Sequence, residues 1–560
     1  ATHTAKAVII LAKDDEPNAA DQLTLRILLT LKSIPYRMSG HVVVEVGDID
    51  NAEMIQLVGG PSCETVSSHD IAGRLMVLAR RELGMCKYVK VLLGFEGEEF
   101  YMREWPELVG IPFGDLIGRF KAAIPIGVLS SDDVVTLNPP MDREILSGDR
   151  LVVVAEDDDT YFPETPTVPL DRTPYPRISV REQQQEIILV CGWRRDLRDI
   201  VLFLDQVVGY RSELHIMTDT VPLAERDAIF EDSGLDTSVL ENITIVHKYG
   251  SATSHKKMVR LDMASYTSCM ICADEAFETD ATTSDSHNAA TVLTVHALQG
   301  NKRFPTVCEL LDSRTIAILA NNSDMRRSTA YCESKKICAQ ILAMVAENRH
   351  VKGILGEIFG AHGSSLAIVP VEKLSSPEEM VSFWVLSARA AHSRMILLGY
   401  QMRNRPELLP KLNPRHKGVP RSWQDMDLLA LVAEPASRLS AERSVTCSQR
   451  LERDAKKQVA AIARAAFSPD VDQTSRRLMG VMLSILEETL EVDESTAPSS
   501  AGNRLQPVKE EADHRDSAPD SHESSRSSRG RSSSCCDAAL RKRQAVSSGA
   551  AAADSHESSR

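Results

Sequence analysis

The chain has 560 residues, enough for about two to four domains, and its 43% hydrophobic content excludes a wholly disordered protein. A formal net charge of −15 argues against nucleic-acid binding by the folded part, because a phosphate-binding surface normally carries a basic excess. Eleven cysteines without a regular spacing favour a reducing compartment over a disulfide framework. No apolar run reaches the roughly 18–20 residues needed to cross a bilayer.

Short apolar runs rich in β-branched residues alternate with helical patterns up to about residue 300. This alternation predicts parallel βαβ units. The stretch 196–208 has the apolar spacing of a helix and directly follows such a run, as the first helix of a Rossmann-like sheet does. The expected strands cover residues 7–12, 41–46, 186–191, 213–217, 242–247 and 268–273.

The sequence contains an internal duplication. Residues 10–15 (ILAKDD) resemble residues 270–275 (MICADE), residues 137–139 (LNP) recur at 412–414, and residues 149–156 (DRLVVVAE) resemble residues 427–434 (DLLALVAE). The spacings between the copies are 260, 275 and 278 residues. We therefore predict an α/β chain with two tandem Rossmann-like domains, each followed by a smaller β-rich lobe.

The predicted domains are a first copy over residues 1–161, a proline-rich linker over 162–185 and a second copy over 186–435. A helical extension over 436–494 and a disordered Ser/Arg-rich tail over 495–560 follow, since the tail lacks apolar periodicity. The first strand begins almost at Ala1, without the elements that precede its counterpart in the second copy. We expect the first copy to be truncated, with its missing part and a membrane pore segment encoded upstream.

Several unusual strings occur in the sequence: 40–45 (GHVVVE), 57–60 (LVGG), 69–76 (HDIAGRLM), 155–161 (AEDDDTY), 188–196 (ILVCGWRRD), 234–236 (GLD) and 240–243 (LENI). They resemble the CASTOR/POLLUX ion channels of plant and algal nuclear envelopes. The resemblance extends over roughly residues 1–435. It implies a homotetrameric, potassium-type channel in a membrane, in the nuclear or plastid envelope, whose domains resemble regulators of potassium conductance (RCK domains) and form a gating ring facing the cytosol or nucleoplasm.

The turn after the strand at 186–191 is where a Rossmann fold binds a dinucleotide. Here Gly192 is followed by Trp193, and the later glycines of the fingerprint are absent, so NAD binding is disfavoured. Arg194 and Arg195 remain candidates to bind an anion at the helix start, or to pair with acids across a subunit contact. Asp219 follows the second strand, where a ribose-binding acid would lie.

Acidic clusters are candidate calcium ligands, because calcium takes six to eight oxygens. Asp274 and Glu275 follow a predicted parallel strand at the edge where such sheets bind ligands. A solvated acidic loop is the alternative interpretation of a second cluster. That cluster contains Glu156, Asp157, Asp158 and Asp159.

Three classes of function compete. The first is a ligand-sensing gating ring of a cation channel, and the second is a soluble NAD-dependent oxidoreductase or nucleotide sensor. The third is a scaffold whose tail binds partners under phosphorylation control. The sequence has no P-loop, no nucleophile elbow and no His-Glu-x-x-His motif, so we predict that the protein is not an enzyme. The broken dinucleotide turn and the duplicated lobe favour the gating ring.

Overall fold

The computed structural model describes residues 4–13, 17–34, 40–95, 97–165, 176, 184–300, 302–320, 322–360, 363–405 and 407–433. The predicted helical extension and tail, and most of the predicted linker, lie outside these residues. Among the described residues, no helix combines the length and the apolar character that a membrane span requires.

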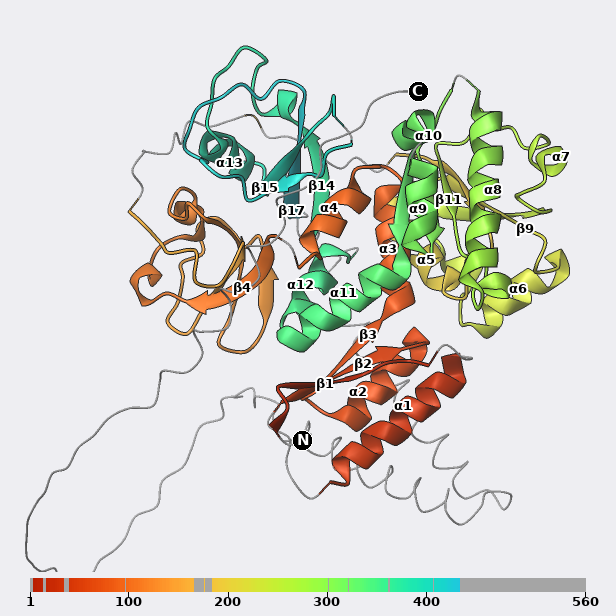
Figure 1. The fold of residues 1–560 in the computed structure, drawn as a ribbon, viewed down its shortest axis with the longest axis horizontal. Helices are drawn as coiled ribbons and strands as arrows, with labels where there is room; N and C mark the ends of the chain where they lie inside the picture. Colours follow the sequence, from red (N-terminus) through yellow and green to blue (C-terminus); the bar gives the residue numbers. More distant parts are fainter. Residues whose placement is uncertain are drawn as a thin grey trace, which may run out of the picture. The chain divides into compact units, whose positions relative to one another are not determined.

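The first copy opens with a parallel sheet of three strands in the order β1-β2-β3 (Figure 1). The middle strand β2 carries Val43 and Val44, which are fully buried. Strand β1 pairs only with β2 among the described residues. The elements are β1 (Ala7–Ile10), α1 (Pro17–Lys32), β2 (His41–Val46), α2 (Ala52–Gly59), β3 (Cys63–Ser67), α3 (Ser68–Ala79) and α4 (Met85–Leu92).

The β-rich lobe of the first copy, here called lobe 1, is an antiparallel sheet in the order β4-β7-β5-β6. Its core holds aromatic side chains, among them Trp105, Phe120 and Tyr161. The strands are β4 (Glu99–Glu104), β5 (Ala123–Leu129), β6 (Val135–Leu137) and β7 (Arg150–Ala155).

The second copy contains a parallel sheet of six strands in the order β10-β9-β8-β11-β12-β13. Its central strands are apolar along their whole length because helices cover both faces, and Leu189 and Val190 are fully buried. The strands are β8 (Ile187–Cys191), β9 (Ser212–Thr218), β10 (Ile243–Tyr249), β11 (Ser268–Ile271), β12 (Thr306–Leu310) and β13 (Thr329–Glu333). The helices are α5 (Leu197–Val207), α6 (Leu223–Asp232), α7 (His255–Met258), α8 (Ala281–Gln299), α9 (Ser313–Ala320), α10 (Ser323–Ser328), α11 (Ser334–Glu347) and α12 (Val351–Ile358).

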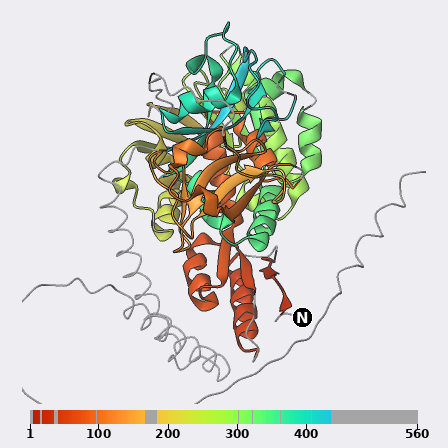
Figure 2. The ribbon, with the colours of Figure 1, turned by 90° about the vertical axis from the view of Figure 1, so that its left-hand side faces the viewer.

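The β-rich lobe of the second copy, lobe 2, repeats the strand order of lobe 1 as β14-β17-β15-β16. Its elements are β14 (Ser364–Pro370), α13 (Phe383–Ala391), β15 (Met395–Met402), β16 (Lys411–Leu412) and β17 (Met426–Ala433). Figures 1 and 2 show lobe 1 in orange beside lobe 2 in blue-green. The predicted fold class, with two Rossmann-like domains and a β-rich lobe after each, is confirmed.

Hydrogen bonds correct the first spacing of the duplication. The amide of Ala12 donates to Glu45 Oε2 at 3.0 Å, and the amide of Ala273 donates to Glu309 Oε2 at 3.0 Å. Ala12 and Ala273 are therefore equivalent, which gives a spacing of 261 rather than 260 residues. The alignment of residues 10–15 with residues 270–275 was wrong by one position. It matched the acidic residues that come after the two strands, and these residues do not lie at the same distance from the ends of β1 and β11.

Strand register tests the other two spacings. Leu137 and Leu412 pair with Gly127 and Gly399 after the same irregularity in β5 and β15, which confirms the spacing of 275. The same two glycines pair with Val152 of β7 and Leu429 of β17, which gives 277. The predicted spacing of 278 was thus wrong by one position. It matched the Val-Ala-Glu strings of the two copies, but these strings differ by one residue in their position along the paired strands.

The two copies exchange helices. Helix α3 of the first copy packs against α5, β12 and β13 of the second, and α11 of the second packs against β1, β2 and β3 of the first. Figure 1 shows the green α11 beside the red sheet. At the end of α3, the fully buried Arg80 donates to Glu186, which directly precedes β8. The copies are separate in sequence but share one hydrophobic core.

Candidate ligand-binding sites

The turn after β8 contains a glycine because the chain passes close to β11. Gly192 has φ 102°, and a Cβ atom there would lie 2.8 Å from the carbonyl oxygen of Cys272. Its amide donates to the carbonyl of Met217 in β9 at 3.0 Å. The glycine therefore holds β8 against its neighbours at the carboxyl edge of the sheet, where ligands of α/β folds bind.

We expect Gly192→Ala to lower the free energy of unfolding by about 2 kcal/mol, through left-handed backbone strain and the contact with Cys272. Gly234→Ala is the matched control, because Gly234 has φ 84° and open space around its Cβ position. Urea denaturation of the two variants separates strain from steric overlap. An equal loss in both would show that the close approach to β11 has no energetic weight.

Asp274 lies beside this turn, and its hydrogen bonds connect the ends of the strands β8, β9 and β11. Its carboxylate accepts hydrogen bonds from the amides of Trp193 (2.8 Å) and Ala276 (3.1 Å) and from the hydroxyls of Thr218 (3.2 Å) and Thr220 (3.0 Å). The residue is 3% exposed. Both oxygens thus already have protein donors, as a buried carboxylate requires.

The other predicted residues of the dinucleotide region have different surroundings. The indole of Trp193 packs on Phe230, with ring centroids 5.2 Å apart. Asp219 is exposed directly after β9. Glu275 is exposed, but desolvation of its carboxyl group raises the pKa of that group against the opposing effect of Arg195.

Arg194 is the centre of a buried ion network at the carboxyl ends of β8 and β12. Its guanidinium donates to Asp196 Oδ1 (2.6 Å), Glu309 Oε2 (2.9 Å) and the carbonyl oxygen of His69 (2.6 Å), and the residue is 2% exposed. Burial opposes the charge, but the two carboxylates raise the pKa of Arg194 above its ordinary value. The anion-binding candidate therefore pairs with acids of its own chain.

Arg195 and His69 meet at a second acid. Glu278 accepts from Arg195 Nη2 at 2.5 Å and lies 3.1 Å from His69 Nε2. Burial, together with the charge of Arg194, lowers the pKa of His69 to about 3. Because His69 begins α3 of the first copy, the network links that helix to the candidate dinucleotide crevice of the second copy.

His69, Glu278 and Glu309 did not emerge from the sequence as site residues. His69 and Arg194 are 125 positions apart, and only the helix exchange brings them together. One signal was present: Glu45 and Glu309 both lie near the ends of equivalent strands, β2 and β12. In the first copy, Glu45 accepts from Cys338 at 3.4 Å, and Cys338 belongs to α11, the helix of the second copy that packs on the first sheet.

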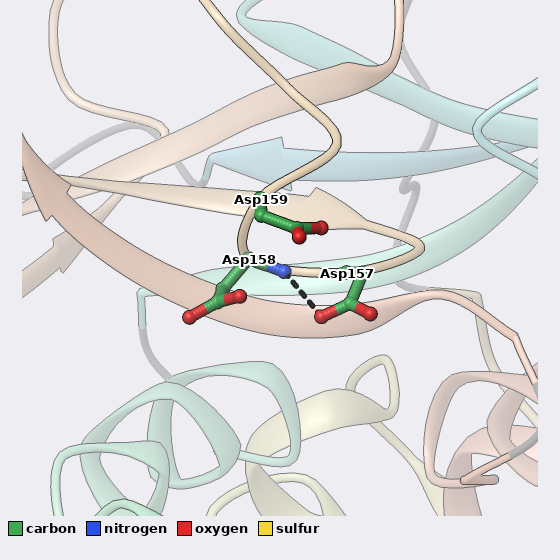
Figure 3. A group of neighbouring side chains, drawn as sticks. All are labelled: Asp157, Asp158 and Asp159. Carbon is green, nitrogen blue, oxygen red and sulfur yellow. Dashed lines mark hydrogen bonds between the residues drawn. The ribbon is translucent and has the colours of Figure 1, made fainter. Parts of the chain in front are cut away.

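The acidic cluster after β7 forms one tight, exposed loop (Figure 3). Ligand atoms of Asp157, Asp158 and Asp159 all lie within 4.8 Å of one another. The amide of Asp158 donates to Asp157 Oδ1 at 2.8 Å, and Thr160 closes the loop through the carbonyl of Asp157 at 2.8 Å. Carboxylate oxygens are the ligands that calcium prefers, with water completing the shell.

Glu156, the fourth acid of the predicted cluster, does not belong to this group of three carboxylates. It is 3.2 Å from the guanidinium of Arg415, which belongs to lobe 2. The acidic loop is therefore adjacent to a contact between the two lobes.

Comparisons with known proteins agree with this architecture. Residues 69–171 match the family model described as Castor and Pollux, part of voltage-gated ion channel. The ion channel CASTOR of Lotus japonicus is 35% identical over 462 residues, covering 77% of this chain and 53% of the relative. The ion channel POLLUX of Lotus japonicus is 34% identical and the probable ion channel POLLUX of Oryza sativa subsp. japonica is 33% identical, each over 77% of this chain and 49% and 47% of the relative.

Among solved structures, the human SLO3 gating ring superposes with a TM-score of 0.57 at 13% identity, covering 78% of this chain and 89% of that chain. This likeness concerns the fold. The chain spans about half the length of the curated relatives that it matches. Over the matched residues, the chain belongs to the CASTOR/POLLUX family of ion channels.

Proposed function

We propose that this chain is the regulatory, gating-ring region of a ligand-gated cation channel. The observation that carries the proposal is the helix exchange, because α3 and α11 make each copy part of the other's core. A ligand that binds one arrangement of the copies better than another shifts their equilibrium, and a linked pore would respond to that shift. The relatives named as ion channels and the gating-ring fold support this function.

The proposal extends to assembly and location. We infer a homotetramer whose ring attaches to a pore of the potassium type, in a nuclear or plastid envelope, with no nucleic-acid partner. We also infer that the chain is not an enzyme, since Arg194 and Asp274, two buried charged groups of the crevice, have their hydrogen-bonding groups engaged with the protein itself. A soluble NAD-dependent oxidoreductase or nucleotide sensor is the alternative.

A chimera tests the channel function. The chain replaces the matching 462-residue region of the Lotus japonicus channel CASTOR, and ion flux into vesicles is recorded with and without calcium. We expect a calcium-dependent flux from the chimera, because the regulatory region would bias the pore. A flux that ignores calcium, magnesium and NAD alike would contradict the proposal. The parent channel measured in the same vesicles is the control.

We propose calcium as the ligand, bound by the loop of Asp157, Asp158 and Asp159. These three carboxylates are exposed and close together, whereas the single carboxylate of Asp274 already accepts hydrogen bonds from four donors. Because Glu156 at the same loop contacts Arg415 of lobe 2, an ion here would act next to the lobe junction. NAD is disfavoured because Arg194, which would meet a pyrophosphate, is paired with Asp196 and Glu309.

Calcium at about 100 times its dissociation constant should raise the free energy of unfolding by about 2.7 kcal/mol. We expect this stabilisation to disappear in the triple variant with Asp157, Asp158 and Asp159 changed to Asn. The matched control changes three exposed acids elsewhere in lobe 1 by the same charge, Asp132→Asn, Asp142→Asn and Glu144→Gln.

Titration calorimetry with calcium, magnesium and NAD in separate runs measures the binding directly. Calcium heat that persists in the loop variant would place the ion elsewhere. Heat and stabilisation from NAD alone would favour the oxidoreductase or nucleotide-sensor alternative.

A further inference from the structure

A small apolar pocket lies between the two β-rich lobes, and the residues that line it belong to neither site described above. Its volume is about 40 Å³. Lobe 1 contributes Phe113, Leu116 and Met141 to the lining, and lobe 2 contributes Trp384 and Met395. A group bound here would therefore touch both copies at once.

One charged side chain, that of Lys417, borders this pocket. Lys417 is 4% exposed, and its Nζ donates to the carbonyl oxygen of Lys121 at 2.6 Å. An ammonium group has three donors, so one hydrogen bond leaves capacity for others. In the part of the chain that the structure describes, no carboxylate oxygen lies within 4.0 Å of this ammonium group.

Three other charged groups bear on this region. Glu98 of lobe 1 acts on Lys417 through its charge and accepts from Asn413 at 2.6 Å, while Glu156 and Arg415 pair with each other at 3.2 Å. Burial raises the pKa of Glu98 to about 7 and lowers that of Lys417 to about 7, with each group's charge opposing the shift of the other. The lysine therefore lacks the close anion that a buried ammonium group normally requires.

We propose that Lys417 and this pocket form a binding site for a short-chain monocarboxylate. The carboxylate would pair with the ammonium group, and the short hydrocarbon chain would occupy the apolar space between the lobes. The pocket is far below the 300 Å³ or so typical of sites for drug-sized ligands, which limits the occupant to a small molecule. The apolar lining disfavours water as the occupant of the remaining space.

Butanoate is the probe, and butan-1-ol is its neutral counterpart of similar shape. Titration of the whole chain at pH 6.5, followed by calorimetry and by ligand-observed NMR, should show saturable butanoate binding with a weaker response to the alcohol. Lys417→Met should weaken butanoate binding by about tenfold or more, because a buried charge pair is lost. It should leave the response to butan-1-ol nearly unchanged.

The matched control is Lys411→Met, which removes an exposed lysine from the same lobe. Ser387→Leu fills the pocket while keeping the charge, so it should weaken both probes. If Lys417→Met does not fold, butanoate and butan-1-ol binding are measured with Lys417→Arg and Ser387→Leu instead, both of which retain the positive charge. Failure of butanoate to bind the unmodified chain at tens of millimolar, or equal butanoate binding by Lys417→Met, would overturn the proposal whatever the outcome of the channel experiments.

Discussion

Replacing Arg194 with methionine is expected to lower the free energy of unfolding by about 3–5 kcal/mol, the range for removing one partner of a buried ion pair. The guanidinium is 2% exposed and satisfies the carboxylates of Asp196 and Glu309 and the carbonyl of His69. Without it, Glu309 keeps the amide of Ala273 as a donor but loses its cation, while itself being 1% exposed.

Arg195→Met is the control for this variant. Arg195 neighbours Arg194 in sequence, but its side chain is more exposed and pairs with Glu278 at the rim. The side chains of Arg195 and Glu278 are 24% and 14% exposed, so this pair is less buried than those of Arg194, and the control should lower the stability less than Arg194→Met. Urea denaturation measures both variants. Equal midpoints for Arg194→Met and the unmodified chain would show that the network does not hold α3 on the second copy.

A second test restores the charge balance. Combining Arg194→Met with Glu309→Gln removes one of the two acids that the single variant leaves uncompensated, so the double variant should be more stable than Arg194→Met alone. The coupling free energy between the two positions measures how far the ion pair, rather than general packing, fixes the exchanged helix. A coupling near zero would assign the loss to packing around Met76 and α3.

The sequence predicted the strands because their apolar runs are continuous and bounded by turn residues. The strand expected at 41–46 has those bounds as β2, and those at 186–191 and 268–273 differ from β8 and β11 only at their ends. Cys269 and Cys272, which lie in the central strand β11 and just after it, are both buried. Such local patterns depend on neighbours in the chain, so they can be recognised from one sequence.

The helix exchange could not be predicted in this way. The apolar face of α3 shows that the helix packs, but not that it packs on the sheet of the other copy. His69 consequently looked like an isolated histidine, although it meets Arg194 and Glu278. Asp274 looked like a ligand of an ion, because its position at the edge of the sheet was visible and its four donors from three segments were not.

The Leu-Asn-Pro string of the internal repeat lies at a contact between the lobes, which the sequence did not predict. Asn138 and Asn413 occupy equivalent turns with φ 44° and 40°, and their amides donate to the carbonyls of Ile126 and Leu398 within their own lobes. Asparagine tolerates the left-handed region better than most residues. In the sequence, each asparagine was noted only as the middle residue of the recurring Leu-Asn-Pro string.

The structure shows that each asparagine side chain reaches the opposite lobe. Asn138 Nδ2 donates to the carbonyls of Arg394 (2.7 Å) and Leu431 (3.1 Å) in lobe 2. Asn413 Nδ2 donates to the carbonyl of Ala122 (2.7 Å) and to Glu98 Oε2 (2.6 Å) on the side of lobe 1. Ala122 and Arg394 precede the equivalent strands β5 and β15, so the two contacts are reciprocal.

We expect the double variant Asn138→Gly, Asn413→Gly to lose about 2–6 kcal/mol of unfolding free energy, at about 1–3 kcal/mol for each asparagine whose partners become unsatisfied. Glycine keeps the left-handed backbone, so the loss reports the side-chain contacts and not strain. His416→Gly is the control, because His416 has φ 58° and is exposed. Urea denaturation gives the stability, and hydrogen exchange of the β5 and β15 amides reports whether the lobes remain docked. If the two single variants add to the double value, the contacts act independently. A double loss smaller than their sum would show that breaking either contact already separates the lobes.

A double variant that is as stable as His416→Gly, with unchanged hydrogen exchange of the β5 and β15 amides, would contradict the assignment of these asparagines as the link between the copies.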